Sequence, residues 1–139
     1  MKYKALTAGF LSFLLSGFVF AEVMVVVSAK SEIASVDSKT LKKLYLGKTK
    51  KIGGVAVNAI NLLDTHPLKI EFDEKALKKD PGKMTAYWSN MIFTGKGAPL
   101  DQVETEEEML NALRKDKLSI GYMSADTISE KVKVLITLP

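Results

Sequence analysis

The sequence contains no cysteine and only one histidine, His66, so the side chains that most often bind transition metals are almost missing. Without thiolates or a cluster of imidazoles, a zinc, iron or copper site of ordinary ligand type is not expected. The spacing of Asp and Glu residues matches no EF-hand loop, and no nucleophile-elbow motif is present. We therefore expect no metal, no other cofactor and no catalytic residue, and we do not expect an enzyme.

A long hydrophobic run occurs only at the start of the chain. Two early lysines precede a mostly apolar run over residues 5–20, which ends in Val-Phe-Ala at 19–21. This pattern is typical of a secretory signal peptide at residues 1–21, cleaved before Glu22. The alternative is an uncleaved membrane anchor, but the apolar run is short for a span. With no cysteine to form a disulfide or carry a lipid, we expect a periplasmic protein that is not embedded in the membrane.

Residues 22–139 are sufficient for one domain with one modest core. Cleavage would remove two lysines and lower the formal net charge from +4 to +2. The chain also has no motif that reads DNA or RNA. Nucleic acid is therefore not expected as a partner.

Strand-like and helix-like segments alternate along residues 22–139. Strands are predicted at residues 23–27, 55–61, 118–123 and 132–136. The first is a run of apolar, mostly β-branched residues, which is typical of a strand buried on both faces. Helices are predicted to begin at Asp37 or Ser38, at Asp64 or Thr65, at Asp80 and at Thr105. This alternation predicts an α/β fold, with a mostly parallel sheet flanked by helices.

The helix that begins at Asp80 contains the only tryptophan of the chain. Its apolar residues recur at helical spacing and form a single stripe: Met84, Tyr87, Trp88, Met91 and Ile92. Gly95 follows and suits the C-terminal cap. We expect a core helix that buries this stripe.

The junction at residues 62–68 joins a strand to a helix that has Pro67 in its first turn. Such a helix start offers unpaired N–H groups and the positive end of the helix dipole, where an anion can bind. Along the same helix, Lys69 and Asp73 have i,i+4 spacing and are expected to pair on the solvent side.

Four short motifs occur in an order and spacing similar to those of phosphate-type periplasmic substrate-binding proteins. They lie at residues 44–48, 72, 87–95 and 119–122. The chain resembles the short, single-lobe members of that superfamily, which are described as phosphate ABC transporter substrate-binding proteins. The resemblance covers nearly all of residues 23–135 and implies a type II periplasmic-binding fold.

The resemblance also implies an oxyanion, such as phosphate, held at a helix start. The matching positions here are Asp64, Thr65, His66 and Lys69. Lys69 stands where an arginine is usual in the family, and the family's Ser-Gly-Thr loop is missing. Asp64 adds a negative charge beside the proposed site, and Pro67 removes one N–H donor. These two departures, together with the missing second lobe, motivate a second hypothesis beside the first.

The first hypothesis is a periplasmic solute-binding protein of the phosphate-receptor type, for ABC-type uptake or sensing. An ABC permease, or a second protein chain that completes the cleft, would then be its partner. The second hypothesis is a periplasmic protein-interaction module that keeps the fold without the ligand. In that case the basic face around Lys42 and Lys43 is expected to contact the partner. The sequence leaves both hypotheses open.

Overall fold

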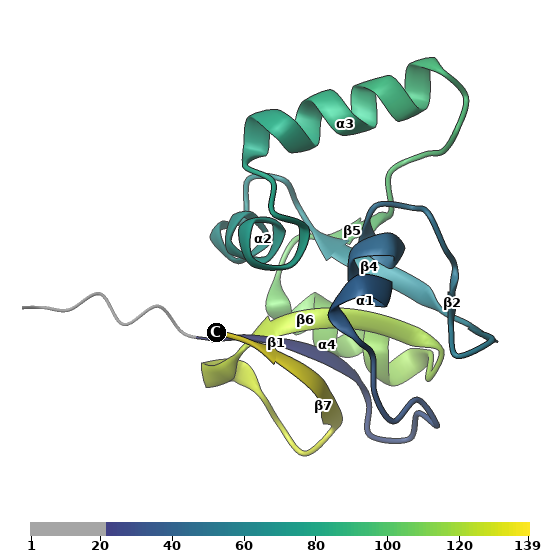
Figure 1. Ribbon diagram of the computed structural model, residues 1–139. Helices are drawn as coiled ribbons and strands as arrows, with labels where there is room; N and C mark the ends of the chain where they lie inside the picture. Colours follow the sequence, from purple (N-terminus) through teal and green to yellow (C-terminus); the bar gives the residue numbers. More distant parts are fainter. Residues whose placement is uncertain (1–21) are drawn as a thin grey trace, which may run out of the picture.

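The computed structural model describes residues 22–139 (Figure 1). The predicted signal peptide, residues 1–21, lies outside the described residues. The strands are β1 Val23–Ser28, β2 Lys51–Ile52, β3 Val55–Ala56, β4 Asn58–Leu62, β5 Asp101–Val103, β6 Ser119–Ser124 and β7 Val132–Leu138. The helices are α1 Ser38–Tyr45, α2 Pro67–Phe72, α3 Pro81–Phe93 and α4 Glu106–Lys115, with a π-helical turn η1 Asp73–Leu77 and a 3₁₀ turn η2 Ala125–Thr127. Within the described part of the chain, no helix is long and apolar enough to cross a bilayer.

The main sheet has the strand order β5-β4-β6-β1-β7. Strand β4 is parallel to β5 and to β6, whereas β1 is antiparallel to β6 and to β7. Strands β5, β4, β6 and β7 therefore point in one direction, and β1 alone opposes them. The predicted α/β class with a mostly parallel sheet is confirmed, and β1 supplies the antiparallel pairs.

Helices cover both faces of this sheet, and two neighbouring residues of β6, which point to opposite sides, contact one helix each. The ring of Tyr122 stacks on Phe72 of α2 with ring centroids 4.0 Å apart. On the other face, the next residue back, Gly121, lies against Met109 of α4. The valines of β1 are fully buried between the two layers, as their β-branched run predicts.

The predicted strand at residues 55–61 is two strands. Val55–Ala56 forms β3, which pairs with β2 as a small separate hairpin. Gly53 and Gly54 form its turn with φ of +55° and +82°, values that glycine adopts without steric cost. The chain then enters the main sheet as β4.

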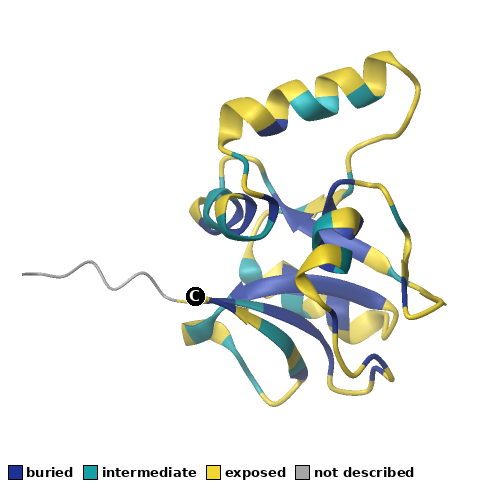
Figure 2. Ribbon diagram, in the orientation of Figure 1, coloured by how far each residue is buried: buried dark blue, intermediate teal, exposed yellow. Residues whose placement is uncertain are grey.

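Helix α3 lies apart from the sheet and is exposed over most of its surface (Figures 1 and 2). The helix itself and its Asp80 N-cap agree with the sequence prediction, but the predicted burial of its apolar stripe is wrong. Only Met84 is buried, and Ile92 is 55% exposed. The reason is that α3 packs on the end of α1, where the Tyr87 hydroxyl donates to the Leu46 carbonyl at 2.6 Å. This packing uses one part of the stripe and leaves the rest uncovered.

Candidate functional site

The start of α2 is the predicted anion site, and its amide groups are already engaged. His66 is the N-cap, instead of the predicted Asp64 or Thr65, and its Nδ1 accepts from the Leu68 amide at 3.1 Å. The amides of Lys69 and Ile70 both donate to the His66 carbonyl. Pro67 has no N–H to offer. The first turn of α2 therefore presents no unpaired backbone donor to an anion.

Lys69 forms a buried ion pair. Its Nζ lies 2.6 Å from Asp73 Oδ2 and 3.4 Å from Asp64 Oδ1. The predicted pairing of Lys69 with Asp73 is confirmed, but its predicted position on the solvent side is wrong, because Lys69 is only 4% exposed. The Asp64 side chain is 81% exposed and also accepts from Gln102 Nε2 at 3.1 Å. The buried Asp73 thus neutralises the charge of Lys69, and the exposed Asp64 contacts the same ammonium group from the solvent side.

Asp73 is held in a site where its charge is costly. The side chain is 5% exposed, and its Oδ1 has no hydrogen-bond partner among the described residues. Burial raises the pKa of the Asp73 carboxyl, and Lys69 offsets part of that rise. An unpartnered buried carboxylate oxygen calls for a hydrogen-bond donor.

These groups line a cleft of about 260 Å³ between α2, α3 and the β4–β5 edge of the sheet. The polar side chains come mainly from α2, η1 and the sheet edge: Asn61, Asp64, Lys69, Asp73 and Gln102. Helix α3 contributes the opposite wall, which includes Met84, Thr85, Trp88, Ser89 and Ile92.

Of the four predicted site residues, the structure brings Asp64 and Lys69 together in this cleft. Thr65 is exposed and His66 is half-buried, and neither lines the cleft. The sequence reasoning missed Asn61 and Trp88 as lining residues. In the sequence, Trp88 is distinguished only by its place on an apolar stripe of a helix. Such a stripe predicts a core residue and gives no indication of a cleft.

A cluster of aromatic rings holds together the strands and helices beside the cleft. The Tyr122 hydroxyl donates to Asn61 Oδ1 at 2.8 Å and accepts from the Leu62 amide at 3.1 Å. The Tyr45 and Phe72 rings meet edge-on, with centroids 4.6 Å apart. Tyr122, which stacks on Phe72, therefore ties the end of β4 to α2. Burial raises the pKa of both tyrosines, so both stay protonated hydrogen-bond donors.

The cleft has a formal charge of −1, since Asp64, Asp73 and Lys69 are its only ionisable lining residues. An anion that enters the cleft would be repelled by this net negative charge. The arrangement consequently suits a neutral or positively charged group better than an oxyanion.

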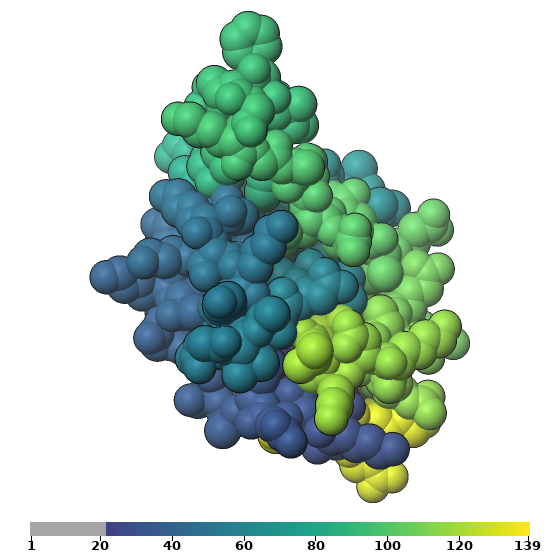
Figure 3. Space-filling model, turned by 90° about the vertical axis from the view of Figure 1, so that its right-hand side faces the viewer, coloured from purple at the N-terminus to yellow at the C-terminus, as the bar shows by residue number. Residues whose placement is uncertain are grey.

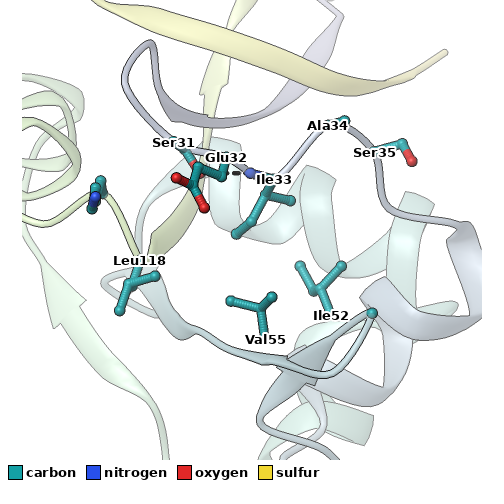
Figure 4. A pocket seen from close by; sticks show the side chains of 10 residues that line it. Ser31, Glu32, Ile33, Ala34, Ser35, Ile52, Val55 and Leu118 are labelled. Atoms are coloured by element: carbon teal, nitrogen blue, oxygen red, sulfur yellow. Dashed lines mark hydrogen bonds between the residues drawn. The ribbon is translucent and has the colours of Figure 1, made fainter.

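A second hollow of about 320 Å³ lies between the loop after β1 and the β2–β3 hairpin (Figure 4). Its walls are largely aliphatic, with Ile33, Ile52, Val55 and Leu118 directed into it. It contains no cluster of ionisable groups. Among residues 22–139, no three His, Asp or Glu side chains are arranged to hold a metal ion.

No protein-family model matches the chain, and no curated protein sequence matches it. Solved structures do match. An ABC-type phosphate transport receptor from Vibrio cholerae aligns with a TM-score of 0.65 and 13% sequence identity. A protein from Clostridium perfringens, whose crystal structure contains bound phosphate, aligns with a TM-score of 0.65 and 11% identity. PstS from Borrelia burgdorferi aligns with a TM-score of 0.60 and 15% identity.

Each alignment covers 83% of this chain but only 45%, 44% and 46% of the three matched chains, respectively. The chain thus spans less than half the length of the solved structures that it matches. At such low identity the likeness shows the fold alone. The chain has the fold of the phosphate-type substrate-binding proteins, over less than half of their length.

Proposed function

We propose that the chain is a periplasmic binding module, not an enzyme, and that it works with a second protein chain. Its matched structures include a transport receptor and a phosphate-bound protein, which supports a binding role over a catalytic one. The cleft is open to solvent at Asp64, whose side chain is 81% exposed, so a partner is needed to exclude water from whatever the cleft holds. The periplasmic part of the proposal rests on the predicted signal peptide, and N-terminal sequencing of the exported protein tests it. A first residue of Glu22 is expected.

The exposed end of α3 is the observation that carries the partner proposal. Phe93 is 91% exposed, and Ile92, next to it, is 55% exposed. In the space-filling view the α3 segment stands out from the rest of the molecule (Figure 3). Ile92 also lines the cleft, so a chain seated on this end of α3 would cover the cleft as well. A large aromatic side chain kept in water is a common mark of a protein contact.

Site-specific photo-crosslinking in intact cells tests this proposal. A crosslinking residue is placed at Phe93, at Lys43 on the predicted basic face, or at the exposed Glu74 as a control. We expect a discrete crosslinked product from position 93 and none from position 74. A product from position 43 alone would move the contact to the basic face. No product at either position would refute the partner proposal.

Oxyanion binding remains a second proposal, favoured by the presence of Lys69 in the cleft. The engaged amides of α2 and the cleft charge of −1 weigh against it. An oxyanion that binds Lys69 must first displace the Asp64 carboxylate. The exposure of the Asp64 side chain allows this displacement. Calorimetric titration with phosphate and sulfate tests the proposal. Saturable heat at millimolar phosphate, lost in Lys69→Met, would rank this function first.

A further inference from the structure

The cleft between α2 and α3 combines a charged wall with an apolar one. We propose that this cleft binds a small organic cation, a primary ammonium group on a short aliphatic chain. The inference goes beyond the proposed partner contact, because it concerns the interior of the cleft and not the exposed end of α3.

The charge of the polar wall favours a cation. Asp73 and Asp64 are both within 3.4 Å of Lys69, which neutralises only one of them. The remaining negative charge lies mainly on Asp64, at the solvent side of the cleft, where its side chain is 81% exposed. An ammonium ligand would balance it, whereas phosphate would add to it.

The hydrogen-bonding groups of the cleft also favour a cation. Asp73 Oδ1 is buried and has no partner in the described chain, so it needs a donor. Asp64 uses its Oδ1 for both Lys69 and Gln102. An ammonium group carries three N–H donors and no acceptor, which suits a site rich in carboxylate oxygens.

The apolar wall would contact the aliphatic part of the ligand. Met84, Trp88 and Ile92 line the cleft from α3, opposite the carboxylates. The face of a tryptophan ring also attracts an organic cation. The cleft therefore pairs a place for a charged head with a place for a hydrocarbon stem.

Trp88 makes the proposal testable without a label, because it is the only tryptophan of the chain. The purified protein is titrated with n-butylammonium chloride, with n-butanol as the neutral match and with sodium phosphate, all at equal ionic strength. We expect a saturable change of tryptophan fluorescence with n-butylammonium, weakened by added salt, and no saturation with the other two. Equal saturation by n-butanol, or saturation by phosphate alone, would overturn the proposal.

Variants locate the site. Asp64→Asn keeps the shape of an exposed side chain and removes one charge, and we expect it to weaken n-butylammonium binding about two- to five-fold. Glu74→Gln removes a charge from an exposed position outside the cleft and is expected to leave binding unchanged. Equal effects of the two variants would refute a site at Asp64. If n-butylammonium does not bind but the crosslink at position 93 still forms, this inference is rejected and the partner proposal stands.

Discussion

Replacement of Lys69 by methionine tests the buried ion pair most directly. The methionine keeps an apolar stem of similar length but removes the ammonium group that lies 2.6 Å from Asp73 Oδ2. Asp73 Oδ1 already lacks a partner, so both oxygens of a 5%-exposed carboxylate would then be unsatisfied. Removing one member of a buried pair in this way typically costs about 3–5 kcal/mol. We expect Lys69→Met to lower the free energy of unfolding by that amount at pH 7.

The loss should depend on pH in a defined direction. Burial raises the pKa of Asp73 above its ordinary value of 3.8, and Lys69 is the main group that opposes the rise. Without Lys69 the folded-state pKa rises further. Below about pH 3.8 Asp73 is protonated in both states, so the penalty is absent there. As pH rises through the higher folded-state pKa, the folded state resists ionisation, and the variant falls increasingly behind the wild type.

Urea denaturation followed by circular dichroism, at pH values from about 3 to about 8, measures both effects. Lys75→Met is the matched control, since Lys75 pairs with Glu71 at the same i,i+4 spacing but with both side chains partly exposed. We expect it to cost less than about 1 kcal/mol, with little dependence on pH. The double variant Lys69→Met/Asp73→Leu should recover most of the lost stability. Equal costs for Lys69→Met and Lys75→Met would refute the reasoning.

Three further destabilising substitutions, two of them with a matched control, test local features by the same denaturation assay. Thr105→Ala removes the N-cap of α4 and should cost about 1 kcal/mol, while Thr105→Ser should be nearly neutral. Gly121→Ala forces a methyl group against the buried Met109 side chain and should cost about 1–3 kcal/mol, whereas Gly82→Ala in the exposed first turn of α3 should not destabilise. Tyr122→Phe leaves a buried amide of β4 without its acceptor and should cost about 1–3 kcal/mol. A loss below about 0.5 kcal/mol in any of the three would contradict the contact it probes.

The fold was largely predictable because its signals are local. The β-branched run of residues 23–27 predicts a doubly buried strand, and the caps at Asp37, Asp80 and Thr105 agree with the structure. The family motifs at residues 44–48, 72 and 119–122 supply the Tyr45, Phe72 and Tyr122 rings, which pack together. These motifs therefore report on the packing of the core, and this explains why they predict the fold well.

The site was less predictable because it depends on contacts between distant segments. Nothing near His66 in the sequence indicates that its ring turns back to cap its own helix instead of leaving the amides open. Lys69 is buried where it pairs with Asp73 and Asp64, whereas helical spacing alone placed it in solvent. Trp88 belongs to the wall of a cleft only because α3 stands away from the sheet, a property that periodicity does not encode.

The position of β1 affects how the chain must fold. This strand lies between β6 and β7, so both of its hydrogen-bonding partners follow it in the chain by more than 90 residues, from Ser119 onward. Until the chain has been made as far as Ser119, the uncharged, proline-free run of residues 23–27 has neither neighbour. A segment of this kind readily joins strands from other molecules. Residues 23–27 are therefore open to pairing with other molecules until β6 and β7 are available to flank them.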